Sequence, residues 1–119
     1  MRPNVLKLWG GACAACGLEL RATSAYECEV AHLRSVEDLG HDNTANALPL
    51  CRTHHWAFDK NLWGIHPRSL VIDVRKDFRK APLGRIHAKR LRGPIWKKDA
   101  TGILAAANLQ WRWDAYRAR

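Results

Sequence analysis

The sequence predicts one small α+β domain, and three of its features carry this prediction. The 119 residues are enough for a single modest core. Residues 26–33 (YECEVAHL) alternate between two faces, as the residues of a strand do. Residues 52–62 and 101–118 instead follow the periodicity of helices. With 47% hydrophobic and 26% charged residues, the composition is that of an ordinary folded protein.

The first half of the chain is expected to begin with a helix and a tight turn. Residues 3–9 (PNVLKLW) form a short helix that starts near Pro3 and is stopped by two glycines at 10–11. A turn over residues 13–17 then leads to the strand at 26–33. Its alternation predicts two faces, with Tyr26, Cys28, Val30 and His32 on one face and Glu27, Glu29 and Ala31 on the other.

The second half continues the mixed pattern. Residues 36–46 form a polar loop rich in Gly, Asp and Asn, and residues 47–51 (ALPLC) are a short apolar piece ahead of the helix at 52–62. The segment 69–74 (SLVIDV) predicts a further strand. Residues 75–98 contain two prolines and two glycines and are assigned to no element. The helix at 101–118 is expected to place one set of side chains on a common face: Leu104, Ala107, Trp111 and Ala115.

Positive charge is concentrated in one segment of the chain. The net charge is +9, and residues 75–98 hold ten basic residues against one acid, so the remainder is neutral. The basic residues are Arg75, Lys76, Arg79, Lys80, Arg85, Lys89, Arg90, Arg92, Lys97 and Lys98. A local concentration of this kind favours a polyanion such as nucleic acid as the partner, and the alternative is a solvated surface.

Four cysteines and six histidines also set the composition apart. We expect reduced thiols in a cytoplasmic protein, because no export signal is recognisable, and no apolar run has the length of a membrane span. Cys13-x2-Cys16 and Cys51-x2-His54 have the ligand spacing of a structural Cys3His zinc site. The alternative is four unrelated buried residues. Cys28 lies outside this set and is expected to be a packed thiol.

A second group of side chains is interleaved with the zinc ligands. His32 ends the predicted strand, Asn46 lies in the loop, and His55 lies early in the predicted helix. His55 and Asp59 are four residues apart, so both project from one helical face and could bind one cation. A neutral imidazole beside a metal-bound phosphate can take a proton from water. The alternative is that His32 is a core histidine and Asp59 a surface charge.

The stretch from Cys28 to Ile65 resembles the signature of the HNH nucleases, in the branch found in restriction-type proteins. That branch reads Glu-x-Ala-His, then Asn-Gly-Leu-x-Leu-Cys, then His-x-x-Phe-Asp. The matching residues are Glu29, Ala31 and His32, then Asn46, Leu48, Leu50 and Cys51, then His55, Phe58 and Asp59. The resemblance covers about residues 13–65.

This resemblance implies the ββα-metal (HNH) fold, a β-hairpin and a helix around one divalent cation, with a zinc knuckle and flanking helices. It implies that His32 is the general base and that Asn46 braces the loop and helps to orient that base. His55 would be a ligand of the catalytic cation, Mg²⁺ or another divalent metal. His54 falls where members with a zinc knuckle place their last zinc ligand.

Ala31 departs from a common family pattern. Many members have an acid or a histidine directly before the base as a metal ligand, although the restriction-type branch shares the alanine. We expect Asp59 to replace this ligand, because related toxin nucleases use two ligands four residues apart on this helix. Glu29 is a weaker candidate on the same strand.

The resemblance implies a metal-dependent DNA endonuclease of a restriction or phage-defence system. The basic segment would bind the DNA backbone without reading its sequence. No membrane partner is expected, and both a homodimer and a larger restriction assembly are compatible with the sequence. Two alternatives remain: a degenerate HNH fold that binds nucleic acid without cutting it, for which Ala31 argues, and a toxin-type nuclease effector.

Overall fold

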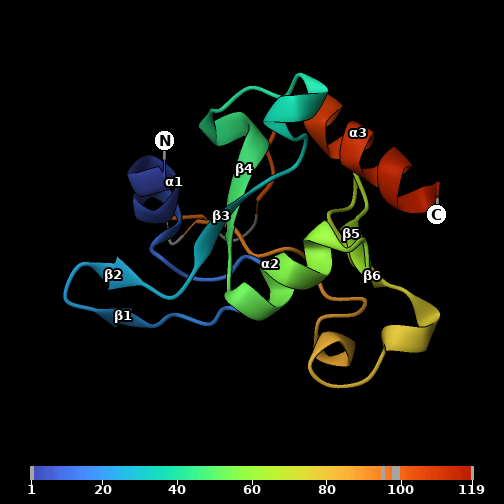
Figure 1. Cartoon of the computed structure of the whole chain (residues 1–119), viewed down its shortest axis with the longest axis horizontal. Coiled ribbons are helices and arrows are strands. Elements are labelled where there is room, and N and C mark those ends of the chain that lie inside the picture. The colour runs from blue at the N-terminus through green and yellow to red at the C-terminus, as the bar shows by residue number, and fades with distance from the viewer. Residues whose placement is uncertain (1, 95, 98–99, 119) are drawn as a thin grey trace.

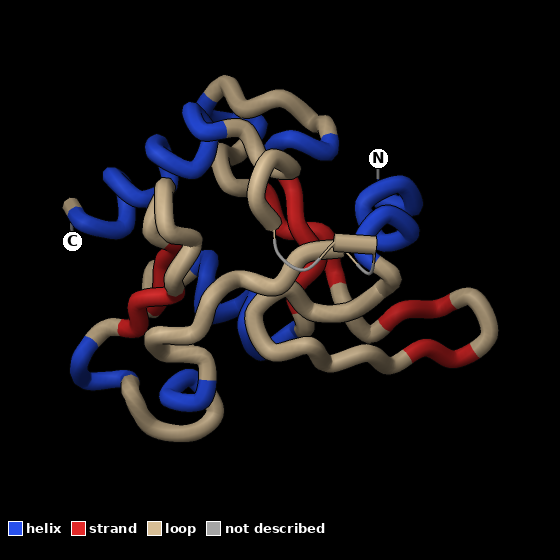
Figure 2. The backbone as a smooth tube through the Cα atoms, turned by 180° about the vertical axis from the view of Figure 1, so that it is seen from behind, coloured by secondary structure: helices blue, strands red, loops and turns tan. Residues whose placement is uncertain are grey.

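The computed structural model describes residues 2–94, 96–97 and 100–118, which form short helices and strands joined by long loops (Figures 1 and 2). The helices are α1 (Arg2–Trp9), α2 (Arg52–Asp59) and α3 (Ala106–Arg117). The strands are β1 (Arg21–Ala22), β2 (Ala25–Tyr26), β3 (Glu29–His32), β4 (Ala47–Leu50), β5 (Trp63–Ile65) and β6 (Ile72–Val74). They pair as antiparallel hairpins in chain order, β1 with β2, β3 with β4 and β5 with β6. None of the described helices is long and apolar enough to cross a membrane.

Helix α1 packs against the β3–β4 hairpin, as Figure 1 shows. The helix ends at the two glycines that the sequence predicted as its stop. Gly10 and Gly11 have φ of 74° and 75°, and the N–H of Gly11 donates to the carbonyl of Leu6 at 2.8 Å. Glycine adopts this left-handed conformation at little cost, so the chain can turn sharply into the cysteine-containing loop.

The β3–β4 hairpin is the centre of the fold. Its register pairs Glu29 with Leu50 and His32 with Ala47. All four residues of β4 are buried, because α1 and α2 both pack against this hairpin. The predicted strand at 26–33 is divided into β2 and β3, and Cys28 and Ala31, which were predicted on opposite faces, are both buried. Alternation cannot separate core from solvent where both sides of a strand are covered.

The segments around α2 differ from the predicted boundaries. Helix α2 ends at Asp59 rather than at residue 62, and Asn61 has a left-handed φ of 57°. The chain then enters β5, which the sequence did not predict. The predicted strand at 69–74 begins only at Ile72, because Leu70 also has a left-handed φ of 61°.

Helix α3 begins at Ala106, five residues later than predicted, after a turn in which Gly102 has φ of 79°. Its buried residues are Leu109 and Tyr116, so the predicted apolar face is wrong, although Leu104 is buried ahead of the helix. The helix packs against β5 (Figure 1). Its first turn is tied to the loop before β4, because the N–H of Ala105 donates to the carbonyl of Ala45 at 2.9 Å.

The basic segment contains two short 3-10 turns, Lys76–Phe78 and Leu83–Arg85. It then forms an isolated bridge between Val71 and Arg90. The N–H of Arg92 donates to the carbonyl of Ala14 at 2.9 Å. The basic segment thus returns to the cysteine-containing turn that follows α1.

Candidate functional site

The four predicted zinc ligands converge in the structure. Cys13 and Cys16 lie on the turn after α1, Cys51 immediately precedes α2, and His54 lies in the first turn of that helix. The ligand atoms of the four side chains all lie within 4.8 Å of one another. The Cys16 and Cys51 sulfurs are 3.9 Å apart, and His54 Nδ1 is 3.0 Å from Cys51 Sγ. Zinc–sulfur bonds of about 2.3 Å in a tetrahedron place two sulfurs at a similar separation.

The chemistry of this donor set fits a zinc ion. Hydrogen bonds with Cys16 and Cys51 hold the pKa of the Cys13 thiol far below its ordinary value. Hydrogen bonds with Cys13 and Cys16 raise the pKa of Cys51 instead. Negative charge therefore collects among these sulfurs, and a divalent cation would balance it. The group could hold a metal ion, consistent with a structural zinc.

Cys28 stays outside the zinc cluster, as predicted. Its side chain is buried, and its thiol donates to the carbonyl of Leu18 at 3.4 Å. Burial raises the pKa of this thiol to about 12. Cys28 is therefore a protonated core thiol at neutral pH, whereas a zinc ligand must be a thiolate.

His32, at the end of β3, is held by a residue that the sequence analysis missed. His32 Nε2 lies 3.0 Å from Asp42 Oδ1. Asp42 belongs to the polar loop between β3 and β4, and nothing in the sequence pattern distinguished it from the loop's other acids. A hydrogen bond from Nε2–H to this carboxylate leaves the lone pair of the imidazole on Nδ1.

Asn46 fastens both ends of this loop. The side chain is fully buried, and its Oδ1 accepts the N–H of Arg34 at 2.9 Å. Its Nδ2 donates to the carbonyls of Arg34 and His41, at 2.7 and 2.8 Å. Arg34 follows His32 by two residues, and His41 directly precedes Asp42. Asn46 therefore braces the segment that carries both members of the His32–Asp42 pair.

His55 lies between two carboxylates. Its Nδ1 is 3.0 Å from Glu29 Oε1, and its Nε2 is 3.4 Å from Asp59 Oδ2. Glu29 is the first residue of β3, and Asp59 is the last residue of α2. No hydrogen bond among the described residues joins His32 to His55. The two histidines lie on adjacent elements, since α2 packs against β3.

The position of Glu29 explains how His55 could bind a cation. A hydrogen bond from Nδ1–H to Glu29 leaves the lone pair on Nε2, the nitrogen that faces Asp59. Nε2 and the Asp59 carboxylate could therefore hold a divalent cation together, since nitrogen and oxygen donors both suit such an ion. Glu29 contacts the opposite nitrogen, so it supports His55 rather than joining that ligand pair.

The basic segment divides into two groups. Arg75 and Arg79 are engaged with the protein itself. Arg75 Nε and Nη2 donate to the carbonyls of Asn61 and Tyr116, both at 2.6 Å. Arg79 Nε donates to the carbonyl of Val74 at 2.7 Å. We therefore leave these two arginines out of the candidate nucleic-acid interface. Lys98 lies outside the described residues.

Four of the remaining basic side chains meet at one cavity beside the cysteine turn. The cavity measures about 450 Å³. It is lined by Ala15, Cys16, Arg85, Ile86, Lys89, Arg90 and Arg92, with no acid among them. Like charges collected around a hollow repel one another, so the arrangement favours an anion at this place. We refer to it below as the basic cavity.

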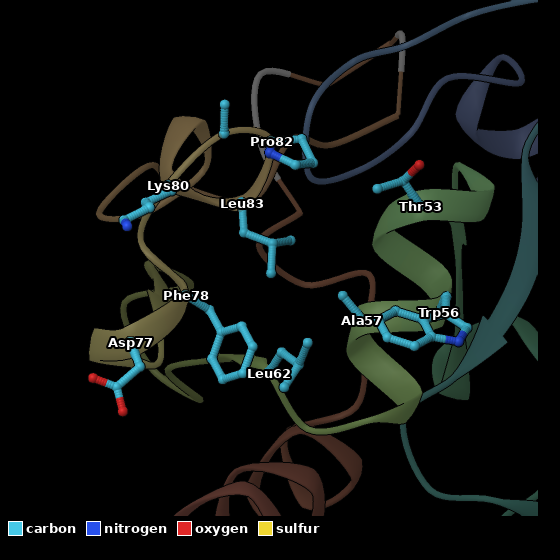
Figure 3. A pocket seen from close by; sticks show the side chains of 10 residues that line it. Thr53, Trp56, Ala57, Leu62, Asp77, Phe78, Lys80, Pro82 and Leu83 are labelled. Carbon is cyan, nitrogen blue, oxygen red and sulfur yellow. The ribbon is translucent and has the colours of Figure 1, made fainter.

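A second cavity, about 360 Å³, is apolar (Figure 3). Trp56 and Ala57 of α2 line one side of it, and Phe78 and Leu83 line the other. Trp56 is 61% exposed and Phe78 is 44% exposed. None of the candidate catalytic or metal-binding residues lines this pocket, so it is separate from the site built by β3 and α2.

Comparisons with known proteins gave one family match and one structural match. No curated protein shows significant similarity to the chain. One structural match is a chain described as the modification-dependent TagI restriction endonuclease, with a TM-score of 0.74 and 19% identity. The match covers 96% of this chain and only 36% of that chain. The family model described as HNH endonuclease matches residues 13–66, the span that holds both metal-site candidates and the candidate base. Over residues 13–66, the chain is thus similar to the HNH endonuclease family.

Proposed function

We propose that this chain hydrolyses phosphodiester bonds of DNA with the help of a divalent cation held by His55 and Asp59. The observation that carries the proposal is the arrangement around His55, where Glu29 occupies Nδ1 and Asp59 faces Nε2. An imidazole ordered in this way presents one free nitrogen beside a carboxylate. A structural role alone requires no such pair at the exposed end of α2.

His32 supplies the base in this proposal. Its Nδ1 accepts a proton from water as the water attacks phosphorus, and Asp42 on Nε2 stabilises the imidazolium that forms. Asn46 keeps the loop of Asp42 in register with β3. The cation, when bound, supplies positive charge that stabilises the phosphate and the leaving 3′ oxygen.

The setting that we propose is restriction or phage defence. The structural neighbour is a restriction endonuclease, although its low identity supports the fold alone. This chain corresponds to about a third of that neighbour's length, so further parts of a restriction assembly would select the target. The basic cavity would bind the DNA backbone without regard to sequence.

Catalytic degeneracy is the second candidate, and one observation favours it. Ala31 is buried and offers no ligand where many family members have one. A chain that binds its cation too weakly would retain DNA binding and lose cleavage. The two candidate functions therefore differ in what happens to bound DNA: an active nuclease cuts it, and a degenerate chain leaves it intact.

The experiment is cleavage of supercoiled plasmid by the wild-type chain with Mg²⁺ or Mn²⁺, with EDTA, and with EDTA followed by excess Mg²⁺. We expect nicked and linear DNA with metal, none with EDTA, and recovery on addition of metal. The new ends should carry 5′ phosphate and 3′ hydroxyl groups, because the 3′ oxygen is the leaving group. Plasmid that is bound but remains intact under every metal condition would favour the degenerate candidate instead.

A further inference from the structure

Arg112 joins the two halves of the candidate nuclease centre, although it lies on α3, outside residues 13–66. Its Nη1 donates to the carbonyl of Leu33 at 3.4 Å, and its Nη2 donates to the carbonyl of Phe58 at 2.5 Å. Leu33 directly follows His32, and Phe58 directly precedes Asp59. One guanidinium therefore spans the end of the strand that bears the base and the end of the helix that bears the metal ligands.

The surroundings of the Arg112 guanidinium favour an arginine at this position. Its Cζ lies 3.9 Å from the centre of the Phe58 ring, and that ring is fully buried. The carbonyl of Phe58 belongs to the last turn of α2, where the helix dipole presents negative charge. A planar guanidinium with fixed donor directions can satisfy two carbonyls at once, which an ammonium group cannot reproduce.

Helix α3 is itself fastened to the loop between β3 and β4. Asn108 Nδ2 donates to the carbonyl of Ala45 at 3.2 Å. The guanidinium of Arg34 lies 5.6 Å from the centre of the Trp111 ring. These contacts fix α3, the helix that carries Arg112, relative to the loop that Asn46 braces. Arg112 and Asp59 also line a common cavity of about 480 Å³ at this edge of the molecule.

We infer that Arg112 is a positioning residue of the nuclease centre, which fixes the end of β3 that carries His32 against the end of α2 that carries Asp59. This inference rests on the proposed function for the roles of those two residues. Both nitrogens described here are bonded to main-chain carbonyls, so Arg112 acts through the backbone. A displacement of about 1 Å between reacting groups can cost about 10²-fold in rate.

The experiment compares Arg112→Ala with Arg117→Ala in the full chain. Arg117 lies on the same helix and contacts the Trp113 ring, 5.8 Å away, so its removal deletes the same charge without touching β3 or α2. We expect Arg112→Ala to lower kcat about 10- to 100-fold with KM for DNA little changed. Calorimetric titration without DNA should show weaker Mn²⁺ binding. Arg117→Ala should match the wild type in all three measurements.

Arg112→Lys tests whether a positive charge alone restores activity, and it replaces the alanine variant if that variant does not fold. It keeps the charge and cannot bond both carbonyls in the same geometry, so it should recover part of kcat and of Mn²⁺ affinity. If the alanine variant does not fold, the lysine variant decides. A folded Arg112 variant with lower Tm but wild-type kcat and Mn²⁺ affinity would overturn the inference. If the wild type does not cleave at all, the proposed function fails, and the Mn²⁺ titration still tests the positioning of Asp59.

Discussion

At the scale of single residues, the two nitrogens of His55 have different partners, and this difference assigns a role to each carboxylate. Glu29 lies 3.0 Å from Nδ1, so it can fix the tautomer and the ring plane. Asp59 lies beside Nε2 and is 60% exposed at its side chain, so it stays accessible to a cation. The sequence already favoured Asp59 over Glu29 as the replacement for a ligand at Ala31, and that choice stays a prediction.

The Asp59 assignment predicts how a variant should respond to metal. Asp59→Ala should lose most cleavage while keeping its fold and its zinc, because His55 alone would hold the cation weakly. Cleavage should recover in part at high Mn²⁺, as measured by initial rates over a metal titration. Asp114→Ala is a matched control, since the Asp114 carboxylate lies on α3 and accepts a hydrogen bond from Gln110 at 2.9 Å. A lower Tm with a normal rate and unchanged metal dependence would show that Asp59 is structural.

The residue types of the site were predictable from the sequence, but not all of their partners. His32, Asn46 and His55 were selected by spacing and by family resemblance. Asp42 was not, because its pairing with His32 depends on the path of a loop that carries no periodic signal. Arg112 was missed for a similar reason, since its carbonyl partners lie 54 and 79 residues away in the chain.

At the scale of elements, the candidate zinc site joins α1, α2 and the basic segment. Cys13 and Cys16 follow α1, Cys51 precedes α2, and Arg92 bonds back to the carbonyl of Ala14 between the two first ligands. Zinc at this place would therefore order three segments that are distant in sequence. A chain of this size gains much of its stability from such a site.

Metal analysis and melting curves test the knuckle together. We expect about one zinc per chain in purified wild type. Cys16→Ser should lose that zinc and melt more than about 10 °C lower, because each 1 kcal/mol shifts Tm by several degrees in a small domain. Cys28→Ser is the control: it changes a buried thiol outside the four candidate ligands and should keep its zinc. Well-folded wild-type protein without zinc would contradict the assignment.

Element boundaries were less predictable than the existence of elements. Helix α2 was expected to reach residue 62, but the left-handed Asn61 ends it early and allows β5 to start. The segment 26–33 was expected to form one alternating strand, yet it is divided into β2 and β3, and both α1 and α2 pack against the β3–β4 hairpin. In both cases tertiary packing overrides a local pattern, which a short segment of sequence cannot reveal.

At the scale of the whole molecule, the excess positive charge and the candidate catalytic residues lie in different parts of the chain. The candidate catalytic residues lie within residues 13–66, whereas the excess positive charge lies in residues 75–98. Four of those cations line the basic cavity, and two others bond to the protein's own carbonyls. DNA binding should therefore depend on where a positive charge lies and not only on the net charge of the chain.

Two double variants that remove the same charge from different places distinguish the effect of charge position from that of net charge. Lys89→Gln with Arg92→Gln removes two charges from the basic cavity, and Arg68→Gln with Arg117→Gln removes two exposed charges outside residues 75–98. The first pair should weaken binding to unrelated DNA sequences and lower the slope of log affinity against log salt by about 2. The second pair should have a much smaller effect on both quantities. Equal losses in the two pairs would indicate that only net charge matters.

The central claim is that His32 takes the proton in phosphodiester hydrolysis, and single-turnover cleavage of DNA by His32→Ala tests it most directly. His41→Ala is the control, because it removes an exposed histidine side chain nine residues away. We expect His32→Ala to cut about 10² to 10⁴ times more slowly while binding DNA with unchanged Kd and salt dependence. His41→Ala should cut at the wild-type rate. A normal cleavage rate in folded His32→Ala would contradict the account.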